Sequence, residues 1–183
     1  MSNIEIIKTN VPPPLNTEIL DYLSKVGWKF AADKHQEFRK PFSQIIKDDE
    51  AKDYGMFITT HEEKFDHTPD KTLNDFGRWI FHLVNIQSKY NLIRPTRMYW
   101  NYYTPQAMPE WHIDESMVGN YVSILYNLHD NDGGTEFQNG ERIESKEGDD
   151  IVFPSHLVHR GYAPVRKHHR FNLNMIALTD GNI

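Results

Sequence analysis

Trp111-His112-Ile113-Asp114 is the stretch around which the rest of the chain is organised, and it lies in a region rich in aromatic and β-branched residues. Side chains alternate along a β-strand, so positions two apart face the same side. A strand here places the His112 imidazole and the Asp114 carboxylate together. They supply two of the three side chains of a 2-His-1-carboxylate metal site. An exposed hydrogen-bonded pair has the same pattern. A metal site therefore requires a second histidine from another part of the chain.

Around this stretch, the C-terminal half alternates short apolar segments with turn residues. Turns are predicted at Asn131-Asp132-Gly133-Gly134, Asn139-Gly140 and Glu147-Gly148-Asp149. Many short strands separated by turns are typical of all-β sandwiches and barrels. The expected strands cover residues 97–104, 111–114, 121–128, 134–138, 142–145, 150–154, 156–159 and 170–178.

The N-terminal half adds helices to this β pattern. We expect a strand over residues 4–7, then a helix capped by Asn16 or Thr17 that ends before Gly27. A second helix over residues 72–90 carries Leu73, Phe76, Trp79, Ile80, Leu83, Val84, Ile86 and Tyr90 on one predicted apolar face. The predicted fold is mainly β with flanking helices (α+β), the helices forming a buttress on a sheet.

Residues 31–69 have the weakest secondary-structure pattern in the chain. The charged run at residues 47–53 is typical of a solvated loop, and a strand is possible over residues 54–60. We find no internal repeat and no linker that divides the chain. The expectation is a single domain over residues 1–183.

Composition excludes several kinds of site. With no cysteine, disulfides, thiolate nucleophiles and iron–sulfur clusters are excluded, and a metal must rest on histidines and carboxylates. A net charge of −6, from 26 acidic and 20 basic residues, argues against tight non-specific nucleic-acid binding. The N-terminus lacks the pattern of a signal peptide, and no apolar run is long enough to span a bilayer. We expect a cytoplasmic protein without a membrane partner, and the sequence leaves its oligomeric state open.

Among the histidines after Asp114, His159 has the surroundings of a ligand. The turn and apolar strand that end at Pro154 place the following residues at the open end of a sheet. His156 lies in the same loop and stays a rival. The others have the pattern of exposed polar residues. The candidates considered are His129, His156, His159, His168 and His169.

A polar strand face supplies the next candidates. Arg170, Asn172 and Asn174 share one face of the strand that Arg170 opens, whereas Phe171, Leu173 and Met175 share the other. A half-exposed strand with a surface arginine has a similar pattern. With a 2-His-1-carboxylate centre nearby, the polar face instead indicates a lined cavity. Such a centre is used by non-haem Fe(II) oxygenases, and a planar guanidinium pairs well with the far carboxylate of a dicarboxylate cosubstrate.

The order of these elements resembles a known family. From about residue 101 to 178 the chain is similar to the catalytic double-stranded β-helix of 2-oxoglutarate/Fe(II)-dependent dioxygenases, in particular the prolyl-hydroxylase-like branch and its small phage-encoded relatives. The resemblance implies a jelly-roll, cupin-like core over about residues 97–179. It rests on Asn101-Tyr102-Tyr103-Thr104, Trp111-His112-Ile113-Asp114, Ser123-Ile124-Leu125-Tyr126-Asn127-Leu128, Gly133-Gly134-Thr135-Glu136-Phe137, Gly148-Asp149-Asp150-Ile151-Val152-Phe153-Pro154-Ser155, His159 and Arg170.

The same resemblance implies site roles. Fe(II) is held by His112, Asp114 and His159, because the family pattern Phe-Pro-x-x-x-x-His selects His159 over His156. Arg170 binds the far carboxylate of 2-oxoglutarate, O₂ is the second cosubstrate, and Tyr103 assists. Tyr102 is the alternative if the strand has the opposite phase, and Arg166 is a weaker competitor for the carboxylate. The remaining residues expected to line the pocket are Asn101, Asn127 and Asn172.

Departures from the pattern and the substrate set the open alternatives. Many prolyl hydroxylases carry lysine at the Arg170 position, and the interval from His159 to Arg170 is slightly long. We expect hydroxylation of a protein, peptide or amino-acid side chain, with prolyl as the first guess, and substrate loops within residues 31–69. One alternative is an AlkB-like nucleic-acid demethylase, whose final motif arginine is replaced here by Ile176. The other is a non-catalytic metal-binding β-barrel, which His156 would complete as a fourth ligand.

Overall fold

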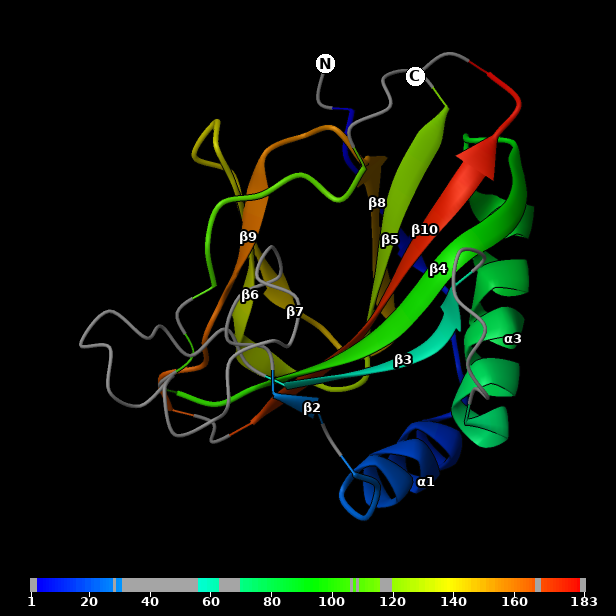
Figure 1. Ribbon diagram of the computed structural model, residues 1–183. Helices are drawn as coiled ribbons and strands as arrows, with labels where there is room; N and C mark the ends of the chain where they lie inside the picture. The colour runs from blue at the N-terminus through cyan, green and yellow to red at the C-terminus, as the bar shows by residue number, and fades with distance from the viewer. Residues whose placement is uncertain are drawn as a thin grey trace.

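The computed structural model shows a mostly β arrangement, with two helices among the residues that it describes (Figure 1). It describes residues 3–27, 29–30, 56–62, 70–105, 107, 109–115, 120–166 and 169–181. All strand pairs are antiparallel. The larger sheet has the order β1 (Glu5–Lys8), β8 (Asp149–Pro154), β5 (Tyr121–Asn127), β10 (Arg170–Thr179), β4 (Leu92–Tyr103), β3 (Met56–Glu62) and β2 (Lys29–Phe30). The smaller sheet has the order β7 (Arg142–Ser145), β6 (Asn131–Phe137) and β9 (His159–Tyr162).

The helices α1 (Pro13–Leu23) and α3 (Lys71–Gln87) lie on the side of the larger sheet that faces away from the smaller one (Figure 1). Buried residues of both helices, including Leu23 and Ile80, belong to one hydrophobic cluster with Trp100, Leu173 and Met175 of the sheet. β10 therefore turns its apolar residues toward the helices. Its alternate residues face the smaller sheet.

Both predicted helices exist, but their details differ. α1 begins at Pro13, not at Asn16 or Thr17, because a proline in the first helical turn has no N–H that would need a partner. Asn16 is instead buried inside the helix and accepts a 2.6 Å hydrogen bond from the Tyr126 hydroxyl. α3 is capped by the Asp70 side chain, which accepts from the Leu73 N–H at 3.0 Å.

Two residues assigned to the apolar face of α3 lie outside it. Trp79 is 37% exposed and Ile86 is 70% exposed. The buried face runs through Leu73, Phe76, Ile80 and Val84, and Ile86 follows Val84 by two residues, or about 200° around the helix. Tyr90 lies beyond the helix end.

Three strand predictions also need correction. β4 begins at Leu92, before Pro95, and β10 has an irregularity opposite Pro95 that accommodates it. Residues 131–134 form the start of β6 rather than a turn, since Gly133 and Gly134 permit close approach of the neighbouring strands. The strand expected over residues 156–159 is found later in the chain, as β9 at His159–Tyr162.

The possible strand over residues 54–60 is found as β3 at Met56–Glu62. The charged run at residues 47–53, and most of the segment 31–69, lie outside the described residues. Among the described residues, no helix is long and apolar enough to cross a bilayer.

Candidate functional site

A short crossing of two chain segments creates the site. Residues 111–114 form no strand, contrary to prediction, but His112 makes an isolated antiparallel bridge with His159 at the start of β9. Each residue donates its N–H to the other's carbonyl at 2.9 Å, and the Asp114 N–H donates to the Ser155 carbonyl at 3.0 Å. Trp111 and Ile113 are about two-fifths exposed, whereas the His112 and Asp114 side chains point inward. The predicted alternation therefore holds without a regular strand.

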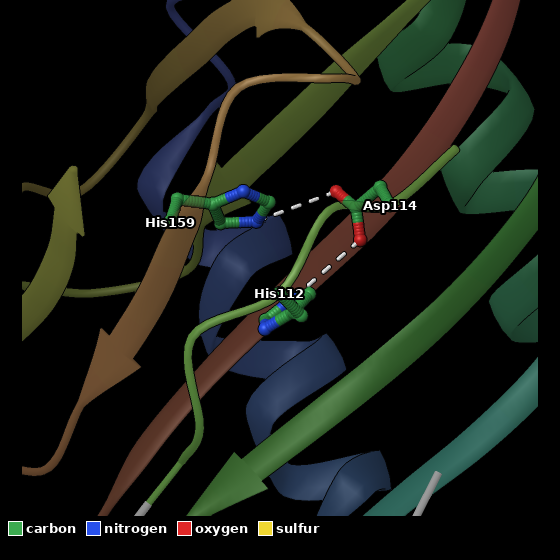
Figure 2. A group of neighbouring side chains, drawn as sticks. All are labelled: His112, Asp114 and His159. Carbon is green, nitrogen blue, oxygen red and sulfur yellow. Dashed lines mark ion pairs between the residues drawn. The ribbon is translucent and has the colours of Figure 1, made fainter. Parts of the chain in front are cut away.

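The three predicted ligands converge (Figure 2). Asp114 Oδ1 lies 3.7 Å from His112 Nε2, and its Oδ2 lies 3.4 Å from His159 Nε2. All three ligand atoms lie within 4.8 Å of one another. In the described part of the chain, this group contains no fourth histidine, cysteine or carboxylate. Three protein ligands leave coordination positions open for other molecules.

Backbone carbonyls fix the tautomers of both histidines. The Glu110 carbonyl lies 2.8 Å from His112 Nδ1, and the Leu157 carbonyl lies 2.9 Å from His159 Nδ1. A carbonyl can only accept, so each Nδ1 carries a proton, and Nε2 is the ring nitrogen that faces Asp114 and is left to bind a metal. A hydrogen bond from the ring nitrogen that does not bind the metal is the usual means of orienting a metal-binding imidazole.

The Asp114 carboxylate is held by neighbours that the sequence analysis did not identify. Ser123 Oγ donates to Oδ2 at 2.7 Å, and the Tyr99 hydroxyl lies 3.4 Å from Oδ1. Arg97 Nη2 donates to the Asp114 carbonyl at 3.1 Å. Burial, and secondarily the charge of Asp114, raises the pKa of the Tyr99 phenol, so its proton is retained for the carboxylate.

A narrow polar pocket extends from this centre between the two sheets. β10 contributes its predicted polar face, and β4 contributes side chains from the opposite register positions, since Arg170 pairs with Tyr103 and Asn172 with Asn101. The residues lining the pocket are Asn101, Tyr103, His112, Leu125, Thr135, His159, Gly161, Arg170, Asn172 and Asn174.

Arg170 is the buried cation of this pocket, with 1% of its surface exposed. Its Nε donates to Ser145 Oγ at 2.8 Å, and its guanidinium lies 5.1 Å from the centre of the Tyr103 ring. Among the described residues, Nη1 and Nη2 have no hydrogen-bond partner. Burial lowers the Arg170 pKa. Because two buried NH₂ groups of a cation without partners are costly, they indicate an anionic ligand.

Comparisons with known proteins agree with this geometry. No family model and no curated protein matches the sequence. Solved structures do match. A Pseudomonas putida prolyl-4-hydroxylase is 14% identical, covers 98% of this chain and 94% of its own, and has a TM-score of 0.60. A Trichoplax adhaerens prolyl hydroxylase, solved with a hypoxia-inducible-factor peptide, is 14% identical, with 98% and 84% coverage and a TM-score of 0.65. HygX from Streptomyces hygroscopicus, solved with nickel and 2-oxoglutarate, is 10% identical, with 98% and 84% coverage and a TM-score of 0.66.

This chain has the fold of the 2-oxoglutarate/Fe(II)-dependent oxygenases. The matched structures include members of the prolyl-hydroxylase branch. At these identities the likeness concerns the fold, and residue roles have to come from the site itself.

Within this oxygenase fold, the β4 register places Tyr103 rather than Tyr102 in the pocket. Tyr102 stacks on Phe171 outside it, with ring centres 4.8 Å apart. Asn101 and Asn172 line the pocket. Asn127 lies opposite Asn172 on β5, but its amide donates to the Asp149 carbonyl, and it is not among the lining residues.

The rival residues lie elsewhere. His156 is in the turn before β9 and does not join the ligand group. Arg166 is exposed, and its backbone N–H donates to Asp132. His129 and His169 lie near Phe171, and His168 falls outside the described residues. Asn174 lines the pocket with the rest of its polar strand face, and three further lining residues were not named from the sequence: Leu125, Thr135 and Gly161.

Proposed function

We propose that this chain is a 2-oxoglutarate- and Fe(II)-dependent dioxygenase that hydroxylates a protein, peptide or amino-acid side chain, with prolyl groups as the first class to test. The observation that carries the proposal is the combination of an open His112-Asp114-His159 group and a buried, unpaired guanidinium on Arg170 in one pocket. A structural metal site needs no buried guanidinium, and its protein ligands normally fill every coordination position.

The residues present fit the implied groups. Two imidazole nitrogens and one carboxylate match the donor set of non-haem Fe(II) centres. The Nη atoms of Arg170 match the far carboxylate of a dicarboxylate. Asn101, Asn172 and Asn174 add polar side chains between these two ends. When bound, Fe(II) and 2-oxoglutarate supply the oxidation: with O₂ they convert a substrate C–H bond to C–OH and release succinate and CO₂.

The chain itself contributes positioning and charge. The Glu110 and Leu157 carbonyls hold the Nδ1–H groups of His112 and His159, which leaves Nε2 of each ring to bind a metal. Ser123 and Tyr99 fix the orientation of Asp114. Ser145 and Tyr103 fix the orientation of Arg170. Burial of the pocket excludes bulk water and strengthens these interactions.

The domain assignment belongs to the same proposal. We propose one catalytic domain over residues 1–183, in which α1 and α3 act as a buttress. The shared hydrophobic cluster of helices and sheet supports it.

The test is turnover of 2-oxoglutarate. Purified protein is loaded with Fe(II) without oxygen, then aerated with 2-oxoglutarate, and succinate is measured. We expect succinate from the wild type and none from Asp114→Ala, which also loses Fe(II) binding. Asp21→Ala, which removes an exposed carboxylate on α1, is the matched control and should behave as wild type.

Two outcomes would contradict the proposal. Fe(II) binding without any succinate would favour the non-catalytic metal-binding barrel. Succinate formation that is stimulated only by methylated DNA, and by no peptide or amino acid, would favour the nucleic-acid demethylase.

A further inference from the structure

β9 is an edge strand of the smaller sheet, and its free edge borders the site. Its residues alternate in the direction of their main-chain groups. Gln138 donates to the Val158 carbonyl on the β6 side, whereas His159 exchanges both its main-chain hydrogen bonds with His112 on the opposite side. Gly161 follows His159 by two residues. Its N–H and C=O therefore point to the same edge as those of His159.

Within the described part of the chain, no segment pairs with that edge at Gly161. In an antiparallel continuation of the His112–His159 bridge, Glu110 would face Gly161, but within the described part of the chain no hydrogen bond joins these two residues. The segment instead diverges from β9 and leaves a groove of about 500 Å³. The groove is lined by Ala107, Pro109, Glu110, Trp111, Arg160, Gly161 and Tyr162.

The outer wall of this groove is held in place by charge pairs. The Arg160 guanidinium lies 4.4 Å from the Trp111 ring centre. It also binds Glu136 Oε2 through Nε at 2.8 Å and Nη2 at 2.7 Å. Arg142 binds the other oxygen of Glu136, and it lies over the Tyr162 ring at 5.0 Å. The wall is thus aromatic and preorganised, a surface suited to an extended chain.

Gly161 also joins the groove to the inner pocket, since it lines both. A Cβ at this position would lie 3.1 Å from the Tyr103 hydroxyl and 3.4 Å from Arg170 Nη1. Because Gly161 has no side chain, the open edge of β9 can lie directly beside Tyr103 and Arg170 of the inner pocket. Directly opposed residues in an antiparallel pair have side chains on the same face. A residue paired with Gly161 has its side chain on the face of His159, beside His112.

We infer that the substrate is a peptide in extended conformation that adds to β9, its main chain exchanging hydrogen bonds with Gly161 in the groove between Trp111 and Tyr162. The inference rests on the proposed function and specifies its substrate class and binding mode. Main-chain pairing at a sheet edge supplies affinity, while the walls select side chains. A small molecule has no such repeated donor and acceptor spacing and would leave the Gly161 edge unsatisfied.

The test uses backbone-modified peptides. Random-sequence peptides are incubated with the Fe(II)-loaded protein, O₂ and 2-oxoglutarate, and a product heavier by one oxygen is identified by mass spectrometry. The best peptide is then N-methylated at one residue at a time. We expect an alternating pattern: methylation at the residue paired with Gly161 lowers kcat/KM about tenfold, and methylation at either neighbour lowers it less than about twofold.

A pair of variants checks the groove. Trp111→Ala should raise KM for the peptide about fivefold or more. Trp79→Ala removes a tryptophan of similar exposure on α3 and should leave KM unchanged.

The possible results separate the two claims. Oxidised peptides without the alternating pattern, or succinate formation with no oxidised peptide, would overturn the extended-strand mode and leave the dioxygenase proposal standing. Absence of succinate under every condition would overturn both.

Discussion

Asp114 is the residue on which the geometry of the centre depends, because it lies between the two histidines. Its carboxylate is oriented by Ser123 on β5 and Tyr99 on β4, and Ser123 Oγ lies 3.0 Å from Ser155 Oγ. Asn174 Nδ2 donates to the Tyr99 hydroxyl at 2.7 Å, so the network reaches the pocket. Partners of this kind orient metal ligands without touching the metal.

Ser123→Ala should therefore weaken Fe(II) binding about 10- to 100-fold, because Asp114 loses its 2.7 Å donor. Anaerobic calorimetric titration with Fe(II) measures the change. Ser24→Ala, at the exposed end of α1, is the control and should bind like wild type. An unchanged dissociation constant for Ser123→Ala would show that the carboxylate orients itself without this donor.

A substitution of Arg170 should weaken the binding of 2-oxoglutarate and leave the binding of the metal nearly unchanged. Replacing Arg170 with glutamine removes the two buried Nη donors, and we expect KM for 2-oxoglutarate to rise at least about tenfold. The Fe(II) dissociation constant should change less than about twofold, since Arg170 is not in the ligand group. Steady-state succinate assays and Fe(II) titration separate the two effects. Equal losses in both would mean that the variant has disturbed the whole pocket.

At the scale of elements, β8 carries an ionisable group that the chemistry does not use. Asp150 is fully buried where β8 pairs with both β1 and β5. Neither of its oxygens has a hydrogen-bond partner among the described residues. Burial raises the Asp150 pKa well above 3.8, which the nearby Thr9 side chain only partly offsets. The folded chain therefore favours the protonated acid.

This pKa shift gives stability a defined pH dependence. Above pH 3.8 the unfolded chain releases the Asp150 proton while the folded chain retains it. The free energy of unfolding then falls as pH rises, until the folded-state pKa is passed. Asp150→Asn should be more stable than wild type at pH 7 by at least about 1 kcal/mol. The difference should vanish below pH 3.8. Urea unfolding at several pH values measures it, and a constant difference would contradict the assignment.

The element scale also shows what could be predicted from sequence. The alternation in Trp111-His112-Ile113-Asp114 and along β10 correctly identified inward-facing residues, because both patterns depend only on neighbours in the chain. Ser123 and Tyr99 were missed because their contact with Asp114 depends on how three separate segments are placed. Prolines interrupt strands and also fit the first turn of a helix. The proline run therefore did not show from sequence that α1 begins within it, and the predicted start of the helix was too late.

At the scale of the whole molecule, β10 divides the core from the site. Leu173 and Met175 pack in the cluster with α1 and α3, while Asn172 and Asn174 line the pocket on the opposite face. The helices contribute no residue to the pocket within the described part of the chain. Stability and ligand binding should therefore respond to different substitutions.

Ile80→Ala tests this separation. Ile80 is fully buried on α3, so the truncation leaves a cavity against the sheet and should lower the free energy of unfolding by about 2 to 5 kcal/mol. Ile86→Ala, on the same helix but 70% exposed, should change it by less than about 0.5 kcal/mol. Below the unfolding transition, both variants should bind Fe(II) with the wild-type dissociation constant. If Ile80→Ala instead weakens Fe(II) binding while still folded, the helices support the geometry of the centre directly and β10 is not a rigid divider.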